Sequence, residues 1–133
     1  MSHAVAEQGY ASTTVAEIAA RAEVSRNAFY RHFAGKRECF LAAFDAITAD
    51  YMAAFATAYR TGGDASQGTA AGLRALFEVV AANPGALRVA TVEIAGAGEE
   101  GIARREQLIT GFEGFLRESL GLAPRRGTIA NPI

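Results

Sequence analysis

Apolar positions recur every three or four residues along most of the chain, which is the spacing of one face of an α-helix. The longest such pattern covers residues 37–60, where one stripe holds Phe40, Phe44, Ile47, Tyr51 and Phe55. No stretch alternates apolar and polar residues as a half-buried strand does, and no Asn-Gly or Asp-Gly hairpin signal occurs. The pattern therefore predicts an all-α fold.

Capping and helix-breaking residues divide this pattern into helices. Thr14 and Glu17 form a capping box, Ser25 is a second N-cap, and Asn83-Pro84 places proline at the first position of a helix. These signals predict helices over residues 1–8, 15–22, 26–33, 37–60, 69–82, 84–95 and 99–120. The segment 61–68 (TGGDASQG) predicts a linker between a first unit, 1–60, and a second.

The segment from residue 13 to residue 36 carries the functional signal. Two short helices joined by a tight turn at Glu23 and Val24 form a helix-turn-helix arrangement, although the same spacing also fits a plain helical hairpin. The second helix would enter the major groove of DNA with short or hydrogen-bonding residues leading, namely Ser25, Arg26, Asn27 and Ala28. Three residues follow at spacings that suit phosphate contacts, namely Tyr30, His32 and Lys36.

Charge is distributed unevenly along the chain. The whole chain has a net charge of −1, which excludes a uniformly polybasic protein. Residues 21–37 nevertheless carry a local excess of +4, because Glu23 is opposed by Arg21, Arg26, Arg31, Lys36 and Arg37. This local basic patch favours a nucleic-acid interface over a plain hairpin.

The quoted positions also resemble a known family. The run Gly9-Tyr10, Thr13-Thr14-Val15, Ile18-Ala19, Ala22-Glu23-Val24-Ser25, Phe29-Tyr30, His32-Phe33 and Lys36 resembles the DNA-binding domain of the TetR family of bacterial transcriptional regulators. This resemblance covers about residues 2–45. The stretch from Asn83-Pro84 through Val92-Glu93-Ile94 to Arg104-Arg105 is more loosely similar to the ligand-binding domain of many members.

The resemblance implies roles for individual residues. Thr13 and Thr14 would contact phosphates, and Tyr30, His32 and Lys36 would do the same. Base edges would face Arg26, Asn27 and Ala28, with Ser25 beside them. Members often carry Gly and Thr where this chain has Asn27 and Ala28, and Ala28 can only touch a thymine methyl group, so the operator sequence is not predicted.

A ligand pocket is the second implied site. The aromatic stripe of helix 37–60 fits either a plain core or a cavity between helices, and the resemblance favours the cavity. The expected lining is Phe44, Ile47, Tyr51, Phe55, Phe77, Val80, Glu93 and Phe112. Glu93 and Arg88 would be polar anchors if they point inward, although a spacing of five residues puts them on different faces.

Two domains follow from the resemblance: a helix-turn-helix DNA-binding domain at 1–45, and a helical ligand-binding and dimerisation domain at 46–133 that shares helix 37–60. The chain is expected to be shortened at both ends. Only about seven residues of a first helix precede Gly9-Tyr10, and residues 126–133 stand where the first of two dimer-forming helices would begin.

The expected function is ligand-responsive, sequence-specific transcriptional regulation. The chain would be a cytoplasmic homodimeric repressor that a small molecule releases from a double-stranded DNA operator. We expect no enzyme activity, cofactor or metal, because no nucleophile–base set or metal-ligand spacing involves His32 or Cys39. We expect no membrane span, because apolar runs such as 51–59 are short. The alternative is a truncated interaction or small-molecule-binding protein that binds no operator.

Overall fold

The computed structural model describes residues 1–122, and in this range the chain forms helices and short connections without any strand. The predicted all-α fold is therefore confirmed. The elements are α1 (Ser2–Gln8), α2 (Val15–Arg21), α3 (Arg26–His32), α4 (Lys36–Tyr59), α5 (Ala65–Ala82), α6 (Pro84–Thr91), the 3-10 helix η1 (Glu93–Ala97) and α7 (Glu99–Ser119). Residues 123–133, which include the expected start of a dimer-forming helix, lie outside the described range.

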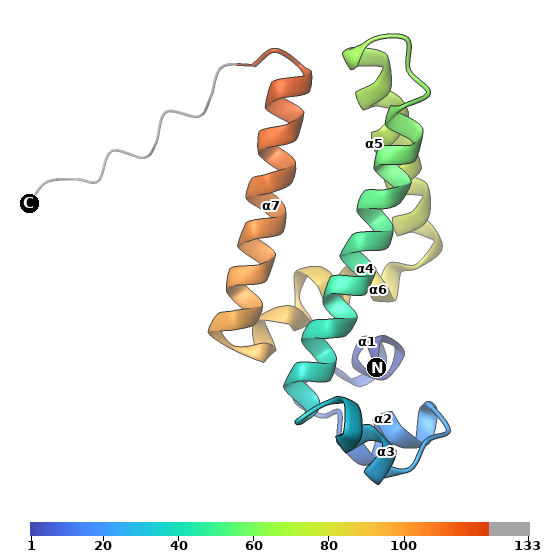
Figure 1. Ribbon diagram of the computed structural model, residues 1–133, viewed down its shortest axis with the longest axis vertical. Helices are drawn as coiled ribbons and strands as arrows, with labels where there is room; N and C mark the ends of the chain where they lie inside the picture. The colour runs from blue at the N-terminus through green and yellow to red at the C-terminus, as the bar shows by residue number, and fades with distance from the viewer. Residues whose placement is uncertain (123–133) are drawn as a thin grey trace, which may run out of the picture.

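Helix α4 is the long axis of the molecule. Figure 1 shows α1, α2 and α3 gathered at its N-terminal end, while α5 and α7 flank its C-terminal half. The segment α6–η1 connects α5 to α7 and packs against α1 as well as α4. One helix therefore carries the helix-turn-helix unit at one end and forms part of the second unit at the other.

Local side-chain caps set the ends of α2 and α3. The Thr14 hydroxyl accepts from the Glu17 amide at 3.3 Å, and the Glu17 carboxylate accepts from the Thr14 amide at 2.8 Å. Ser25 Oγ accepts from the Ala28 amide at 3.0 Å. Both predicted N-caps are thus present, and they fix where each helix begins.

The turn between α2 and α3 is tight because α2 ends in a reversal of backbone hand. Glu23 has φ 54°, in the left-handed region. The amides of Glu23 and Val24 donate back to the carbonyls of Ala20 and Ala19, which closes α2 with a Schellman motif. A glutamate in this conformation is strained, since left-handed backbone brings Cβ close to the following carbonyl.

Two apolar cores follow one another along the molecule. The smaller one lies inside the helix-turn-helix unit and is built from Ile18, Ala19, Phe29 and Cys39. The larger one joins α1 and α4 to α6 and η1, through Val5, Phe40, Leu41, Phe44, Val89, Ala90, Ile94 and Ala97. Because this larger core combines residues from both sides of position 45, the two units share packing, and the boundary at 45/46 stays a prediction.

Helices α4 and α5 pack closely through glycine. A Cβ on Gly72 would lie 2.7 Å from the Phe55 ring, and one on Gly68 would lie 2.7 Å from the Tyr59 carbonyl oxygen. The predicted linker 61–68 is too long, because Asp64 Oδ1 accepts from the Gln67 amide at 2.8 Å and starts α5 at Ala65. An aspartate cap inside a glycine-rich run was the missed signal.

The connection from α6 to α7 also differs from the prediction. The helix begun by Pro84 ends at Thr91 rather than near Gly96, and η1 follows as a separate turn. Gly101 allows the start of α7 to pack closely against η1, since a Cβ at this position would lie 2.1 Å from the Ile94 carbonyl oxygen. Further along α7, the Phe112 and Phe115 rings meet Phe55 edge-on, with centroids 5.2 and 5.4 Å away.

In the range 1–122, α4 is the one helix long and apolar enough by length and composition to cross a membrane. Core helices of soluble proteins also pass that test. Here Phe40, Phe44 and Phe55 are buried against other helices of the same chain, and the motif is attached to the N-terminal end. These three large apolar side chains of α4 are therefore used in internal packing.

Candidate functional site

The first turns of α3 form an exposed polar surface. Ser25, Arg26 and Asn27 are exposed, and Ala28 beside them is half-buried. Phe29, next along the helix, is buried in the smaller core and holds α3 in place. The Tyr30 side chain is 51% exposed, and its ring meets Phe29 edge-on at 5.3 Å. The helix thus buries one side and presents hydrogen-bonding side chains on the other.

Three arginines beside this surface have no carboxylate within ion-pair distance in the part of the chain that the structure describes, namely Arg26, Arg31 and Arg37. Arg21, by contrast, forms an ion pair with Glu7. Arg31 and Arg37 were counted in the basic patch but not predicted as site residues. The unpaired charge therefore lies on α3 and at the start of α4. His32 at the end of α3 and Thr14 at the start of α2 are also exposed.

Thr13 does not belong to this surface. Its side chain is 1% exposed, its hydroxyl donates to the Gly9 carbonyl at 2.8 Å, and Gln8 Nε2 lies within reach at 3.4 Å. The predicted phosphate contact of this hydroxyl is wrong for the described conformation, because the donor is already used inside the protein. Thr13 instead fixes the turn that leads from α1 into α2.

Lys36 has a structural contact that the sequence did not indicate. Its Nζ donates to the Tyr10 carbonyl at 2.9 Å and to the Ala11 carbonyl at 3.4 Å, and it lies 4.4 Å from the centre of the Tyr10 ring. The ammonium group therefore ties the start of α4 to the loop before α2. One remaining N–H can still point outward, so the predicted phosphate contact stays a prediction.

Tyr10 connects the helix-turn-helix unit to η1. Its amide donates to Glu93 Oε2 at 2.8 Å, while Arg88 Nη2 donates to Glu93 Oε1 at 2.9 Å. The amide hydrogen bond, together with the Arg88 charge, holds the pKa of the Glu93 carboxyl below its ordinary value. The Tyr10 ring packs on Phe40 with centroids 4.7 Å apart.

Glu93 was predicted to line the ligand pocket, and that prediction is wrong. Its carboxylate is occupied by Tyr10 and Arg88 on the side of η1 that faces the motif. We refer to the contacts of Glu93, Tyr10 and Lys36 as the joint. Tyr10 and Glu93 are 83 residues apart, which is why no local pattern linked them.

An apolar cavity of about 570 Å³ lies between α4, α5, α6 and α7. Four residues predicted for a pocket line it, namely Tyr51, Phe77, Val80 and Phe112. The other apolar walls include Met52, Leu76, Leu87, Leu108, Ile109 and Leu116. Phe77 is 67% exposed and Ile109 is 57% exposed, so the cavity opens to solvent between α5 and α7.

The remaining predicted pocket residues lie elsewhere. Phe44 is buried in the larger core and Ile47 packs against that core, while Phe55 lines a smaller neighbouring cavity of about 310 Å³. All three share the stripe of α4, but α4 turns different parts of that stripe toward different helices. Periodicity selects the buried face and cannot assign positions along it to core or cavity.

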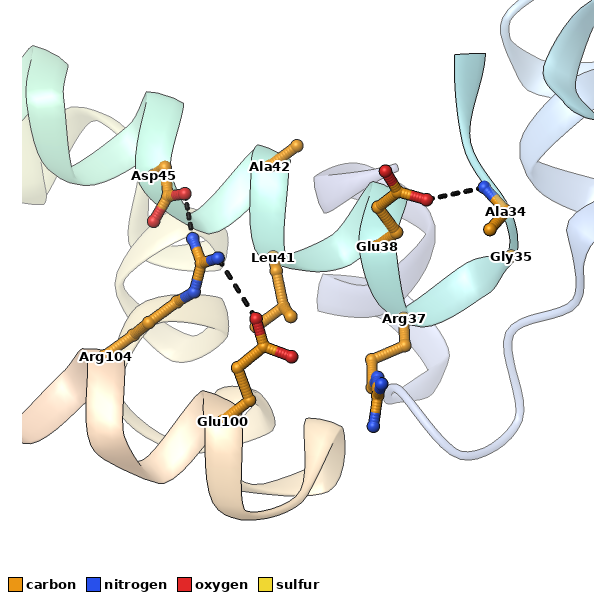
Figure 2. A pocket seen from close by; sticks show the side chains of 9 residues that line it. All are labelled: Ala34, Gly35, Arg37, Glu38, Leu41, Ala42, Asp45, Glu100 and Arg104. Carbon is orange, nitrogen blue, oxygen red and sulfur yellow. Dashed lines mark hydrogen bonds and ion pairs between the residues drawn. The ribbon is translucent and has the colours of Figure 1, made fainter. Parts of the chain in front are cut away.

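A second, charged cavity of about 490 Å³ lies where the start of α7 approaches α4 near the motif. Figure 2 shows Arg104 between the carboxylates of Asp45 and Glu100, with ion pairs to both. Glu38 accepts from the Ala34 amide at 2.6 Å, so three carboxylates around this cavity already have donors. Arg104 therefore fastens α7 to α4 near the helix-turn-helix unit.

Within residues 1–122, no group of three His, Cys, Asp or Glu side chains could hold a metal ion. Cys39 is buried in the smaller core, where burial raises the pKa of its thiol. A raised pKa leaves little thiolate, so the thiol acts as a small packing group.

Comparison with known proteins identifies the N-terminal segment. Residues 3–43 match the sequence model of bacterial regulatory proteins of the tetR family. Comparisons with curated proteins and with solved structures gave no match. The matched segment ends inside α4, so it contains α1, α2, α3 and the contacts of Lys36.

Proposed function

We propose that this chain, whose residues 3–43 match the N-terminal domain of tetR-family regulators, is a DNA-binding transcriptional regulator, and that it is a repressor released from its operator by a small molecule. The observation that carries the proposal is the exposed surface of α3 with its unpaired arginines. A cytoplasmic location follows from this role, because the operator is chromosomal DNA.

On DNA, α3 would lie in the major groove. Arg26 and Asn27 are the exposed side chains able to make paired hydrogen bonds to base edges, with Ala28 against a thymine methyl group. The phosphates on either side would meet Thr14, Tyr30, His32 and Lys36, together with Arg31 and Arg37. Phosphate contacts provide affinity and base contacts provide sequence preference.

A homodimer would present two copies of α3 to half-sites about 34 Å apart. Exposed apolar residues near the end of the described chain support a second copy at this surface. They are Phe115, Leu120 and Leu122, which are 37%, 46% and 54% exposed. Burying such residues against the same surface of a partner would give the two-fold symmetry of a palindromic operator.

The joint offers a physical route from effector to operator. Leu87, Ala90 and Thr91 of α6 line the apolar cavity, and α6 leads directly into η1 and Glu93. An effector that displaces α6 would move the acceptor of the Tyr10 amide and hence the loop that Lys36 holds. The effector releases the operator to the extent that it binds the displaced arrangement more tightly.

Selection of bound duplexes from a random library at two salt concentrations tests the proposal. We expect enrichment of a palindrome and affinity that falls steeply with salt. Salt-sensitive retention without enrichment would contradict sequence-specific repression. Absence of retention at both concentrations would instead favour a small-molecule-binding protein that does not bind an operator.

A matched pair of arginine variants locates the interface. With the selected duplex, Arg26→Ala is expected to lose about 1–3 kcal/mol of discrimination between operator and scrambled DNA. Arg60→Ala, at the far end of α4, is expected to leave this discrimination unchanged. Among the described residues, the side chain of Arg60 forms a hydrogen bond with Thr57 alone. Equal effects of the two variants would contradict the assignment of α3 as the recognition helix.

A further inference from the structure

Tyr51 is the residue of the cavity wall whose polar group has no partner among the described residues. Tyr51 lies in the middle of α4, lines this cavity and is 8% exposed. Its hydroxyl is buried and, among the described residues, has no hydrogen-bond partner. A buried hydroxyl without a partner has lost its hydration without compensation, so a ligand oxygen that reaches it and pairs with it gains affinity.

The other polar groups of the cavity wall are already partnered. The Thr48 hydroxyl donates toward the Phe44 and Asp45 carbonyls, at 3.0 and 3.1 Å. Arg105 Nη1 donates to the Thr91 carbonyl at 3.3 Å, and Glu113 forms an ion pair with Arg117. The wall carries one cation, Arg105, and one anion, Glu113, so it has no net charge to compensate a charged ligand for the loss of its hydration.

The volume and the lining of the cavity suit a mainly apolar ligand. Its volume of about 570 Å³ suits a molecule of one or two rings. Phe77, Phe112 and several aliphatic side chains supply the remaining walls, and the opening beside Phe77 and Ile109 provides an entry. Removing apolar ligand surface from water would supply most of the binding free energy.

We propose that the effector is an uncharged, mainly apolar small molecule whose carbonyl, ether or hydroxyl oxygen pairs with the Tyr51 hydroxyl. This inference rests on the proposed function and specifies the chemistry of its effector. It assigns Tyr51 as the residue that distinguishes an oxygen-bearing ligand from the corresponding hydrocarbon.

Three naphthalene probes test the proposal by fluorescence titration. The first is 6-propionyl-2-(dimethylamino)naphthalene, an uncharged ketone. The second is the same dimethylaminonaphthalene without the acyl group, and the third carries a carboxylate in place of the acyl group. Each probe is titrated into the wild-type chain, Tyr51→Phe and Tyr59→Phe. Tyr59 lies on the same helix but outside this cavity, so its variant is the matched control.

We expect Tyr51→Phe to weaken the binding of the ketone but not the binding of the probe without the acyl group. The ketone should bind Tyr51→Phe about fivefold more weakly than the wild type, because one hydrogen bond is lost. The probe without the acyl group should bind Tyr51→Phe at least as tightly as the wild type, because it leaves no hydroxyl unpaired. Tyr59→Phe should match the wild type with both probes, and the carboxylate should bind the wild type at least tenfold more weakly than the ketone.

Several results would overturn the proposal. One is equal affinity of the ketone for the wild type and Tyr51→Phe, and another is a preference for the carboxylate. A third is the absence of saturable binding by any probe, as expected if another part of this chain or a second copy fills the cavity. Operator binding by the wild type, measured with the selected duplex, distinguishes failure of the effector proposal from failure of the proposed function. If the wild type binds the operator, only the effector chemistry is wrong. If it does not, the proposed function also fails.

Discussion

The two ends of α4 differ in how completely they cover their apolar surface. At the motif end, Ile18 and Phe29 are 3% and 4% exposed, and the side chains facing solvent are mainly polar or charged. At the other end, Phe77, Ile109 and Leu122 are 67%, 57% and 54% exposed. Local caps and a small core suffice for the motif, whereas the long helices α5 and α7 leave apolar faces for a ligand or a second copy.

This difference indicates which region depends on other molecules. The motif has a defined turn, two side-chain caps and its own core, so the exposed surface of α3 that we propose for DNA is formed within one chain. The cavity and the apolar end of α7 are surfaces whose burial would stabilise a particular arrangement of α5, α6 and α7. The joint connects the two regions by hydrogen bonds, and the proposed route from effector to operator passes through it.

Removal of one phenylalanine from each region is expected to give the largest contrast. Phe29→Ala should destabilise the fold by about 3–5 kcal/mol, because it leaves a void in the motif core. Phe77→Ala should change stability by less than about 0.5 kcal/mol, since its side chain is mostly in solvent. Urea unfolding followed by circular dichroism measures both. Similar losses for the two variants would mean that Phe77 is buried in solution by a partner.

Helical glycines allow the same comparison within the second region. Gly72→Ala should cost about 1–3 kcal/mol, because the new methyl group would meet the Phe55 ring at 2.7 Å. Gly114→Ala on α7 should stabilise by about 0.5–1 kcal/mol, since no atom of another described element lies within 4 Å of its added Cβ and alanine favours helix. Thermal unfolding provides the measurement. A loss of stability in Gly114→Ala would show that another chain packs on that face of α7.

The joint should make stability sensitive to acid. The pKa of Glu93 is lowered in the folded state, so its ionised form contributes stability above the unfolded pKa of about 4.3. That contribution is lost as the pH falls through the lower, folded pKa. Glu93→Gln should cost about 1–2 kcal/mol at pH 7 and flatten the decline below about pH 4.

Urea unfolding at a series of pH values between 7 and 3 tests this prediction. Glu106→Gln, at an exposed position of α7, is the control and should retain the wild-type acid dependence. If Glu93→Gln also retains the wild-type dependence, the contact between η1 and Tyr10 is not formed in solution, and the proposed route from effector to operator is wrong.

The smallest expected effect concerns the strained turn of the motif. Glu23→Gly should stabilise the fold by about 0.5–1 kcal/mol, because glycine adopts the left-handed conformation at φ 54° without the Cβ clash. Glu23→Gln removes the same charge but keeps the clash. Both variants should bind DNA slightly more tightly, while only the glycine variant should have a higher Tm. Equal Tm values would mean that the turn is not strained.

Local signals predicted much of the molecule. The Thr14 and Ser25 caps, the break at Gly35 and proline at the first position of α6 each depend on contacts within a few residues, and all are present. The start of α5 was misplaced because a glycine-rich run hid the Asp64 cap. In the pocket, four of the eight expected residues line the cavity, because periodicity finds apolar faces but not the position of each residue along them.

The sequence by itself determined the all-α fold, the helix-turn-helix unit and the exposed residues of α3, because helix propensity, capping and periodicity act over a few residues. Only the tertiary structure decided that Thr13 points inward, that Lys36 holds the Tyr10 loop, and that Glu93 joins η1 to that loop across 83 residues. It likewise decided that Tyr51, whose buried hydroxyl has no partner among the described residues, lines an open apolar cavity. These features depend on how distant helices pack, and no local pattern in the chain encodes that packing.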